Sequence, residues 1–199
     1  MTKSIMLVGV GGQGTILASK LLTIGLMEAG YDVKMSEIHG MSQRGGSVSS
    51  QVRYGKKVYS PVIEVGGADM IVSFEKMEAL RYLKYLKPNG KIVANNFKLN
   101  SVSTLTGKFE YKEKEIDEEL KRLNATVINA AKKAEELGNI KVMNVILLGS
   151  LVKSMNLEHI NWEEIISKNV KEKFIKLNIE AFKAGISLIE NDELAVSNI

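Results

Sequence analysis

The chain has 199 residues, 45% of them hydrophobic, a formal net charge of +4 and no cysteine. We expect one domain over residues 1–199, and the lack of cysteine excludes disulfides, thiolate metal sites and iron–sulfur clusters from this chain. The basic residues are scattered, and the longest apolar run (residues 142–152) is shorter than the about 20 residues of a membrane span, so we expect no nucleic-acid or membrane binding and a cytoplasmic location.

The first half of the chain alternates apolar strands with helical segments. Residues 5–10 form an apolar, β-branched run that ends in glycine, which indicates a buried parallel strand. Residues 14–29 carry only two charges and predict a helix that is buried on most sides. Further strands are expected at residues 32–37, 47–54, 58–60 and 70–74. The middle two of these should form a β-hairpin whose first strand is half exposed, because its apolar residues alternate with polar ones.

The second half continues the alternation. Residues 75–86 predict a helix, Pro88-Asn89-Gly90 predicts a turn, and residues 91–95 predict a strand. The remaining expected elements are a helix at 113–123, a strand at 125–129, and helices at 130–137, 142–155 and 171–190. This order predicts a Rossmann-like three-layer α/β fold, with a mostly parallel sheet between helices, a β-hairpin excursion and a C-terminal helical segment.

The first functional motif is the glycine loop Gly9–Gly14 (GVGGQG), which follows a predicted strand and opens a predicted helix. Glycine lets the backbone approach a ligand, and the helix N-terminus adds free amides and about half a positive charge. Glu37 stands near the place of a ribose-binding acid, so this motif alone suggests NAD. The alternative is that the glycines only permit close packing of strand and helix.

The second motif is the loop His39–Gly46 (HGMSQRGG). It does not fit an NAD site, where the second strand normally leads into a helix and not into a long polar loop. Arg44 has small or polar neighbours and indicates an anion clamp, because its guanidinium presents a fixed fork of donors. Alternatively, Arg44 pairs with Glu37 in a solvated loop. His39 is either an acid or base, or a hydrogen-bonding spacer.

Together, residues 9–14, 37–53, 60–61 and 67–69 closely resemble the gamma-type subunit of 2-oxoacid:ferredoxin oxidoreductases, and the resemblance extends from residue 5 to about residue 185. The form of the second loop favours the aryl-pyruvate (indolepyruvate) branch. In the 2-oxoglutarate branch the loop typically begins with Tyr-Gly and contains Glu-x-Arg-Gly-Gly.

The resemblance implies a subunit of a heteromeric oxidoreductase of anaerobic metabolism that is inactive alone. Such enzymes decarboxylate a 2-oxoacid on thiamine diphosphate, reduce ferredoxin through iron–sulfur clusters and pass the acyl group to coenzyme A. It implies that a large partner subunit holds the thiamine diphosphate, Mg and 4Fe-4S clusters. This chain would bind no cofactor alone, and would help to enclose the active site and bind coenzyme A.

The expected site residues come from both loops. The candidates for coenzyme A binding are Gly11, Gly12, Gln13, Gly14, Ser42, Gln43, Arg44, Gly45 and Gly46. His39 is the one candidate for catalysis, and no metal ligand is expected. Two other functions remain open from the residues alone: a stand-alone NAD(P)-dependent oxidoreductase, and a non-catalytic nucleotide-sensing or scaffold protein.

Overall fold

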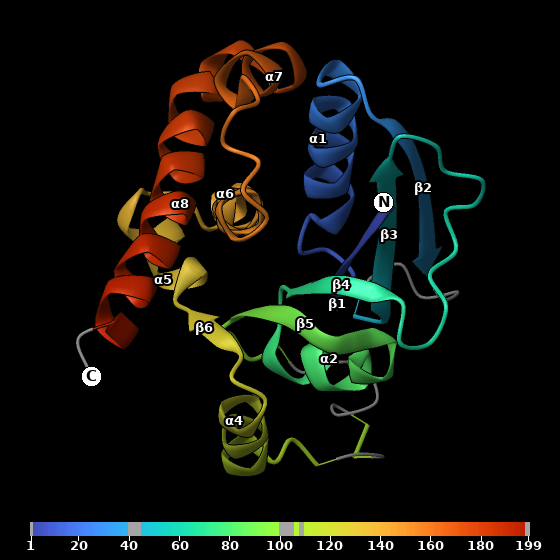
Figure 1. Cartoon of the computed structure of the whole chain (residues 1–199). Coiled ribbons are helices and arrows are strands. Elements are labelled where there is room, and N and C mark those ends of the chain that lie inside the picture. The colour runs from blue at the N-terminus through green and yellow to red at the C-terminus, as the bar shows by residue number, and fades with distance from the viewer. Residues whose placement is uncertain (1, 40–44, 100–105, 108–109, 198–199) are drawn as a thin grey trace.

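The computed structural model describes residues 2–39, 45–99, 106–107 and 110–197. Its sheet has six strands in the order β2-β3-β1-β4-β5-β6 (Figure 1). β1, β4, β5 and β6 run parallel to one another, whereas β3 is antiparallel to both of its neighbours, β1 and β2. The expected α/β fold is therefore confirmed, with an antiparallel start to an otherwise parallel sheet. The strands are β1 (Lys3–Val10), β2 (Asp32–His39), β3 (Ser47–Gly55), β4 (Ala68–Ser73), β5 (Leu86–Asn95) and β6 (Thr126–Ile128).

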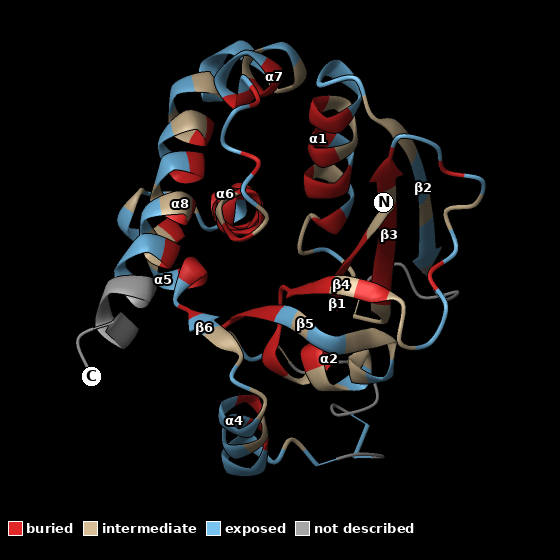
Figure 2. Cartoon of the chain, in the orientation of Figure 1, coloured by how far each residue is buried: buried red, intermediate tan, exposed pale blue. Residues whose placement is uncertain are grey.

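Helices cover both faces of the sheet (Figure 1). One face carries α2 (Lys76–Arg81) and α4 (Glu113–Arg122). The opposite face carries the larger core, in which α6 is buried on nearly all sides between α1 and α8 (Figure 2). The helices on this side are α1 (Thr15–Glu28), α5 (Ala130–Glu136), α6 (Met143–Ser154), α7 (Trp162–Asn169) and α8 (Ile175–Ser197). Short 3-10 turns lie at η1 (Leu83–Tyr85), η2 (Ile140–Val142) and η3 (Glu172–Phe174).

The predicted hairpin of residues 47–54 with 58–60 is wrong. β3 instead lies between β1 and β2 and is almost entirely buried, and residues 58–60 are not in a strand. Two polar side chains of β3, the buried Gln51 and the half-buried Arg53, hold the following loop. The Gln51 side-chain oxygen accepts a hydrogen bond from Ile63 N at 2.6 Å, and Arg53 Nη1 donates to the carbonyl oxygens of Ser60 and Val62.

The predicted turn at Pro88-Asn89-Gly90 lies inside β5 and does not precede it. Ala68 pairs with Leu86 and Met70 pairs with Lys91, so the turn residues form an irregularity within the strand. Asn89 there has a φ of 63°, a conformation that asparagine tolerates better than most residues. The predicted helix at 75–86 ends earlier than expected. After α2, residues 83–85 form η1, and Leu86 already begins β5.

Candidate functional site

The first glycine loop and the described end of the second, Gly45 and Gly46, lie side by side where β1 ends and β3 begins. Gly11 N donates to the carbonyl oxygen of Gly46 at 2.8 Å, and Gly45 N donates to that of Gly11 at 3.2 Å. These bonds continue the β1–β3 ladder past its last pair, Val10 with Ser47. Gly45 has a φ of 73°, which favours glycine. The structure therefore brings the described ends of both loops into one backbone unit.

Several predicted site residues lie outside the described part of the chain. These are Ser42, Gln43 and Arg44 of the second loop, so the anion clamp at Arg44 remains a prediction. The backbone of His39 pairs with Val48 at the end of β2, and its side chain also lies outside the described structure.

The Gln13 side chain shapes the first loop from within. Its oxygen accepts a hydrogen bond from Val10 N at 2.8 Å, and its nitrogen donates to the carbonyl oxygen of Phe74 at 3.0 Å. The amide thus closes the loop on itself and joins it to the chain after β4. A Cβ atom on Gly9 would lie 2.8 Å from the Gln13 oxygen, so a side chain at Gly9 would disturb this arrangement.

The start of α1 carries no compensating charge. Gly14 is the N-cap residue, with a φ of 83° and no side chain to accept a hydrogen bond, and the first turn contains no acidic residue. The amides of this turn and the positive end of the helix dipole are therefore available to an anion.

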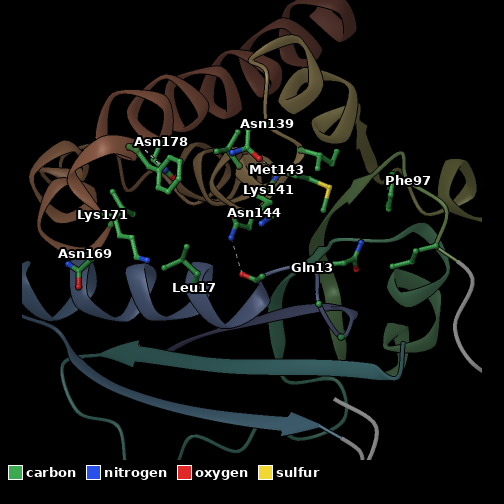
Figure 3. Close-up of a pocket in the computed structure, with 18 residues that line it drawn as sticks. Gln13, Leu17, Phe97, Asn139, Lys141, Met143, Asn144, Asn169, Lys171 and Asn178 are labelled. Atoms are coloured by element: carbon green, nitrogen blue, oxygen red, sulfur yellow. Dashed lines mark hydrogen bonds between the residues drawn. The ribbon is translucent and has the colours of Figure 1, made fainter. Parts of the chain in front are cut away.

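A cavity of about 880 Å³ lies over this helix start (Figure 3). The first glycine loop and α1 form one wall, and residues 139–144 and 169–178 form the other. Apolar side chains, among them Leu17, Phe97 and Phe174, line much of it. Its size and apolar walls with a few polar groups are typical of a small-molecule site. The polar side chains that line the second wall are Asn139, Lys141, Asn144, Asn169, Lys171 and Asn178.

The cavity is positively charged. Lys141 and Lys171 line it, and no aspartate or glutamate is among its described lining residues. Neither lysine forms an ion pair with any residue that the structure describes, whereas the buried Lys76 elsewhere is paired with Glu113 and Asp117. Two unpaired ammonium groups near an uncapped helix start favour an anionic ligand with apolar parts.

Asn144 connects the second wall to the glycine loop. Its side chain is 6% exposed, and its nitrogen donates to the carbonyl oxygen of Gly14 at 3.4 Å (Figure 3). Sequence reasoning missed Asn144, Lys141 and Lys171 as site residues, because each is more than 120 positions from the motif it faces. Asn139, by contrast, caps η2 through a bond from Lys141 N at 3.0 Å.

The position of Glu37 does not support an NAD site. Glu37 pairs with Ser50 across β2 and β3, and Ser50 pairs in turn with Leu7 of β1. Two strand spacings, roughly 10 Å, therefore separate Glu37 from β1. In dinucleotide-binding folds the strand that ends in the ribose-binding acid lies directly beside the first strand. The inserted strand β3 removes that relationship.

Two buried carboxylates lie at the start of α2, one at the N-cap and one in the first turn. Glu75 caps this helix by accepting a bond from Glu78 N at 3.1 Å, and it also accepts a bond from the Tyr111 hydroxyl at 2.5 Å. Glu78 accepts bonds from the Ser47 hydroxyl and from Arg81 Nε. Burial raises the pKa of both carboxyl groups above the usual range, although these hydrogen bonds oppose the rise.

In the described parts of the chain, no three His, Asp or Glu side chains are grouped so that they could hold a metal ion. Those parts also contain no helix that is both long enough and apolar enough to cross a membrane.

Structural comparison finds the same fold in oxidoreductase subunits. The gamma subunit of a keto/oxoacid ferredoxin oxidoreductase from Geobacter sulfurreducens matches with a TM-score of 0.68 and 23% identity, over 94% of this chain and 97% of that one. The 2-oxoglutarate:ferredoxin oxidoreductase from Magnetococcus marinus, solved with 2-oxoglutarate, coenzyme A and succinyl-CoA bound, matches with a TM-score of 0.73 and 22% identity. That match covers 96% of this chain but 31% of the other.

Sequence comparison establishes the family. The indolepyruvate oxidoreductase subunit IorB of Pyrococcus horikoshii is 39% identical over 92% of this chain and 94% of its own length. Residues 4–188 match the family described as pyruvate ferredoxin/flavodoxin oxidoreductase. The resemblance carried by the two glycine loops is confirmed, and the chain belongs to the pyruvate ferredoxin/flavodoxin oxidoreductase family.

Proposed function

We propose that this chain is the coenzyme-A-binding subunit of an indolepyruvate-type 2-oxoacid:ferredoxin oxidoreductase, and that it helps to enclose an active site held mainly by a partner subunit. The single observation that supports this best is the positively charged cavity over the first glycine loop, which contains two unpaired lysines and no described carboxylate. Coenzyme A combines phosphate groups with an adenine ring and a long, largely uncharged arm, and both kinds of surface are present there.

The binding residues in this proposal come from both walls. Lys141 and Lys171, together with the free amides at the start of α1, would meet phosphate groups. The apolar side chains of Leu17, Phe97 and Phe174 would pack against the adenine ring or the arm. The Gly11–Gly14 backbone would lie against the ligand, and Ser42–Gly46 would close over it from the second loop.

A separate partner subunit is part of the proposal. This chain has no cysteine to hold an iron–sulfur cluster, and it has no thiamine motif. The thiamine diphosphate that supplies the decarboxylation chemistry, with Mg and the 4Fe-4S clusters, would therefore belong to the partner, and ferredoxin would be reduced through the complex. In the Magnetococcus protein the matching part is 31% of a longer chain, which supports a fold that works joined to others.

The test is co-purification of the chain with its partner from the native host, followed by iron and thiamine analysis. We expect the isolated chain to be colourless and inactive. The assembled complex should reduce a viologen dye only when both indolepyruvate and coenzyme A are present. Turnover by the isolated chain, or a complex that reduces the dye equally fast without coenzyme A, would contradict the proposal.

A further inference from the structure

Gly45 and Gly46 have no side chains that could hold the end of the second glycine loop in place. Ser47, which begins β3, is the first side chain after these two glycines. Its hydroxyl donates to the Glu78 carboxylate at 2.5 Å and lies 3.3 Å from the Tyr82 hydroxyl. The loop is thus attached to α2, an element that follows β4 and is otherwise remote from it in the sequence.

Glu78 is an unusual residue for that place. It is 1% exposed, and removing a carboxylate from water is costly unless hydrogen bonds compensate. Its two oxygens accept from Ser47 and from Arg81 Nε at 3.0 Å, so both are used within the protein. An apolar residue would fill the same space without this cost. The cost indicates that the Ser47 contact has a use beyond packing.

The Glu78 carboxylate is also held in position. Its own backbone amide donates to Glu75, and Glu75 accepts the hydroxyl of Tyr111. Glu75 is 1% exposed as well. A chain of hydrogen bonds, buried at its centre and half-buried at its ends, therefore runs from Tyr111 through Glu75 and Glu78 to Ser47. It ends at the glycines that bond to Gly11.

We infer that Glu78 is a positioning residue, which through Ser47 fixes Gly45 and Gly46, the described end of the second glycine loop, against Gly11 at the proposed coenzyme A site. The part that concerns coenzyme A rests on the proposed function. The part that concerns the loop does not, because it is a statement about the backbone of this chain alone. The two parts are tested separately.

The first test measures amide hydrogen exchange by NMR in the full chain, at Gly11 and Gly45, whose amides join the loops. Ser47→Ala should speed exchange at both amides by roughly tenfold or more, since a hydrogen bond to a charged group is lost. Glu78→Gln should also speed exchange at these amides. Ser47→Thr keeps the hydroxyl, so its exchange rates should stay close to those of the wild type. Amides in the β4–β5 ladder should keep their wild-type rates.

The matched control is Glu119→Gln. Glu119 also pairs with an arginine three residues later, Arg122, but on α4 and without a serine. It should leave exchange at Gly11 and Gly45 unchanged. Unchanged exchange in Ser47→Ala would overturn the inference. So would an equal increase at all amides, because that would show a role in global stability alone.

The second test uses the assembled enzyme. Ser47→Ala and Glu78→Gln should each raise the KM for coenzyme A several-fold, while the KM for the 2-oxoacid stays unchanged. The double variant should be no worse than the worse single variant, because both changes break one contact. If the wild-type complex needs no coenzyme A, the proposed function is wrong. The exchange measurement at Gly11 and Gly45 still tests whether Ser47 and Glu78 hold the glycines in place. If the complex needs coenzyme A but its KM does not change in these variants, the link from the loop to coenzyme A is wrong.

Discussion

Gly14, at the start of α1, and Asn144, in the first turn of α6, are packed so closely that a Cβ atom on Gly14 would overlap the Asn144 side-chain amide. Gly14 also has a φ of 83°, so its lack of a side chain satisfies two requirements at once. The contact joins two helices that are 130 residues apart in the chain and sets the width of the cavity between them.

Gly14→Ala should therefore lower the free energy of unfolding by roughly 2–4 kcal/mol, from backbone strain and overlap together. Gly12→Ala is the matched control, since Gly12 has a φ of 105° but nothing within 4 Å of its Cβ position. It should cost only the strain, about 1–2 kcal/mol. Urea unfolding measures both. An equal decrease in the free energy of unfolding of both variants would show that the contact between Gly14 and Asn144 does not affect stability.

The double variant Lys141→Ala, Lys171→Ala should raise the KM for coenzyme A roughly tenfold or more, because it removes both unpaired positive charges of the cavity. The melting temperature should stay the same, since both side chains are exposed. The charge-matched control is the double variant Lys176→Ala, Lys183→Ala, which removes two charges from exposed parts of α8 outside the cavity. A similar rise in that control would indicate only a long-range charge effect.

Arg44 lies outside the described residues, and its role as a phosphate clamp stays a prediction from the sequence. Arg44→Ala should leave the melting temperature nearly unchanged and weaken apparent coenzyme A affinity by roughly 10- to 150-fold. Arg44→Lys should recover part of this loss, because a point charge cannot reproduce the bidentate fork. A mutant that assembles poorly but has a normal KM for coenzyme A would instead place Arg44 in an interface.

The loop between β3 and β4 should become protected when the partner binds. Tyr59, Val62 and Val65 are 88%, 62% and 68% exposed there, although Arg53 and Gln51 hold the backbone beneath them. Permanent interfaces often bury about 2,000 Å² or more and favour such apolar side chains. Hydrogen exchange with and without the partner, over residues 38–60 and over the rest of this loop to residue 67, is the measurement. An absence of added protection would contradict this placement.

Asp69 should make stability depend on acid pH. Burial raises the pKa of this carboxyl group, but hydrogen bonds from Lys87, from Ser4 N and from Lys3 outweigh that effect, so the pKa lies below its usual range. Its contribution is therefore present above the unfolded pKa of about 3.9 and is lost as the pH falls through the folded value.

Asp69→Asn should accordingly lower the free energy of unfolding by about 1 kcal/mol at pH 7, a small value because both lysines reach solvent. The difference from wild type should shrink as the pH falls below about 4. Urea unfolding at several pH values tests this, with Glu118→Gln, an exposed carboxylate on α4, as the control. A difference that does not change with pH would mean that the amide disturbs packing and that the ion pairs contribute little.

The sequence predicts local structure here better than long-range pairing. The run at residues 5–10 and the helix at 14–29 were predicted correctly, because burial of whole elements leaves a clear apolar pattern. The alternation of apolar and polar residues in β3 wrongly predicted a half-exposed strand. Gln51 is polar, yet it is buried and bonded to the following loop. α7 left no clear pattern, although Trp162 packs against Gly25 of α1.

For the candidate site, too, the sequence shows local motifs but not contacts between distant residues. Both glycine loops were visible as motifs, because glycine clusters after a strand have few other uses. Lys171, just before η3, and Asn144, on α6, were not predicted as site residues, because the role of a single lysine or asparagine depends on which residues the fold places opposite it. The role of Gln13 was also hidden, since nothing in the sequence shows that its amide faces Val10 and Phe74.

The bonds from Gly11 to Gly46 and from Gly45 to Gly11 have a consequence for assembly. A molecule that fixes Gly11 would also fix Gly45 and Gly46, and the reverse, so the loss of conformational entropy would fall on whichever molecule binds first. A partner subunit that contacts Gly45 and Gly46 would thereby strengthen the proposed coenzyme A binding at the first loop. By thermodynamic reciprocity, coenzyme A would tighten the complex by the same factor.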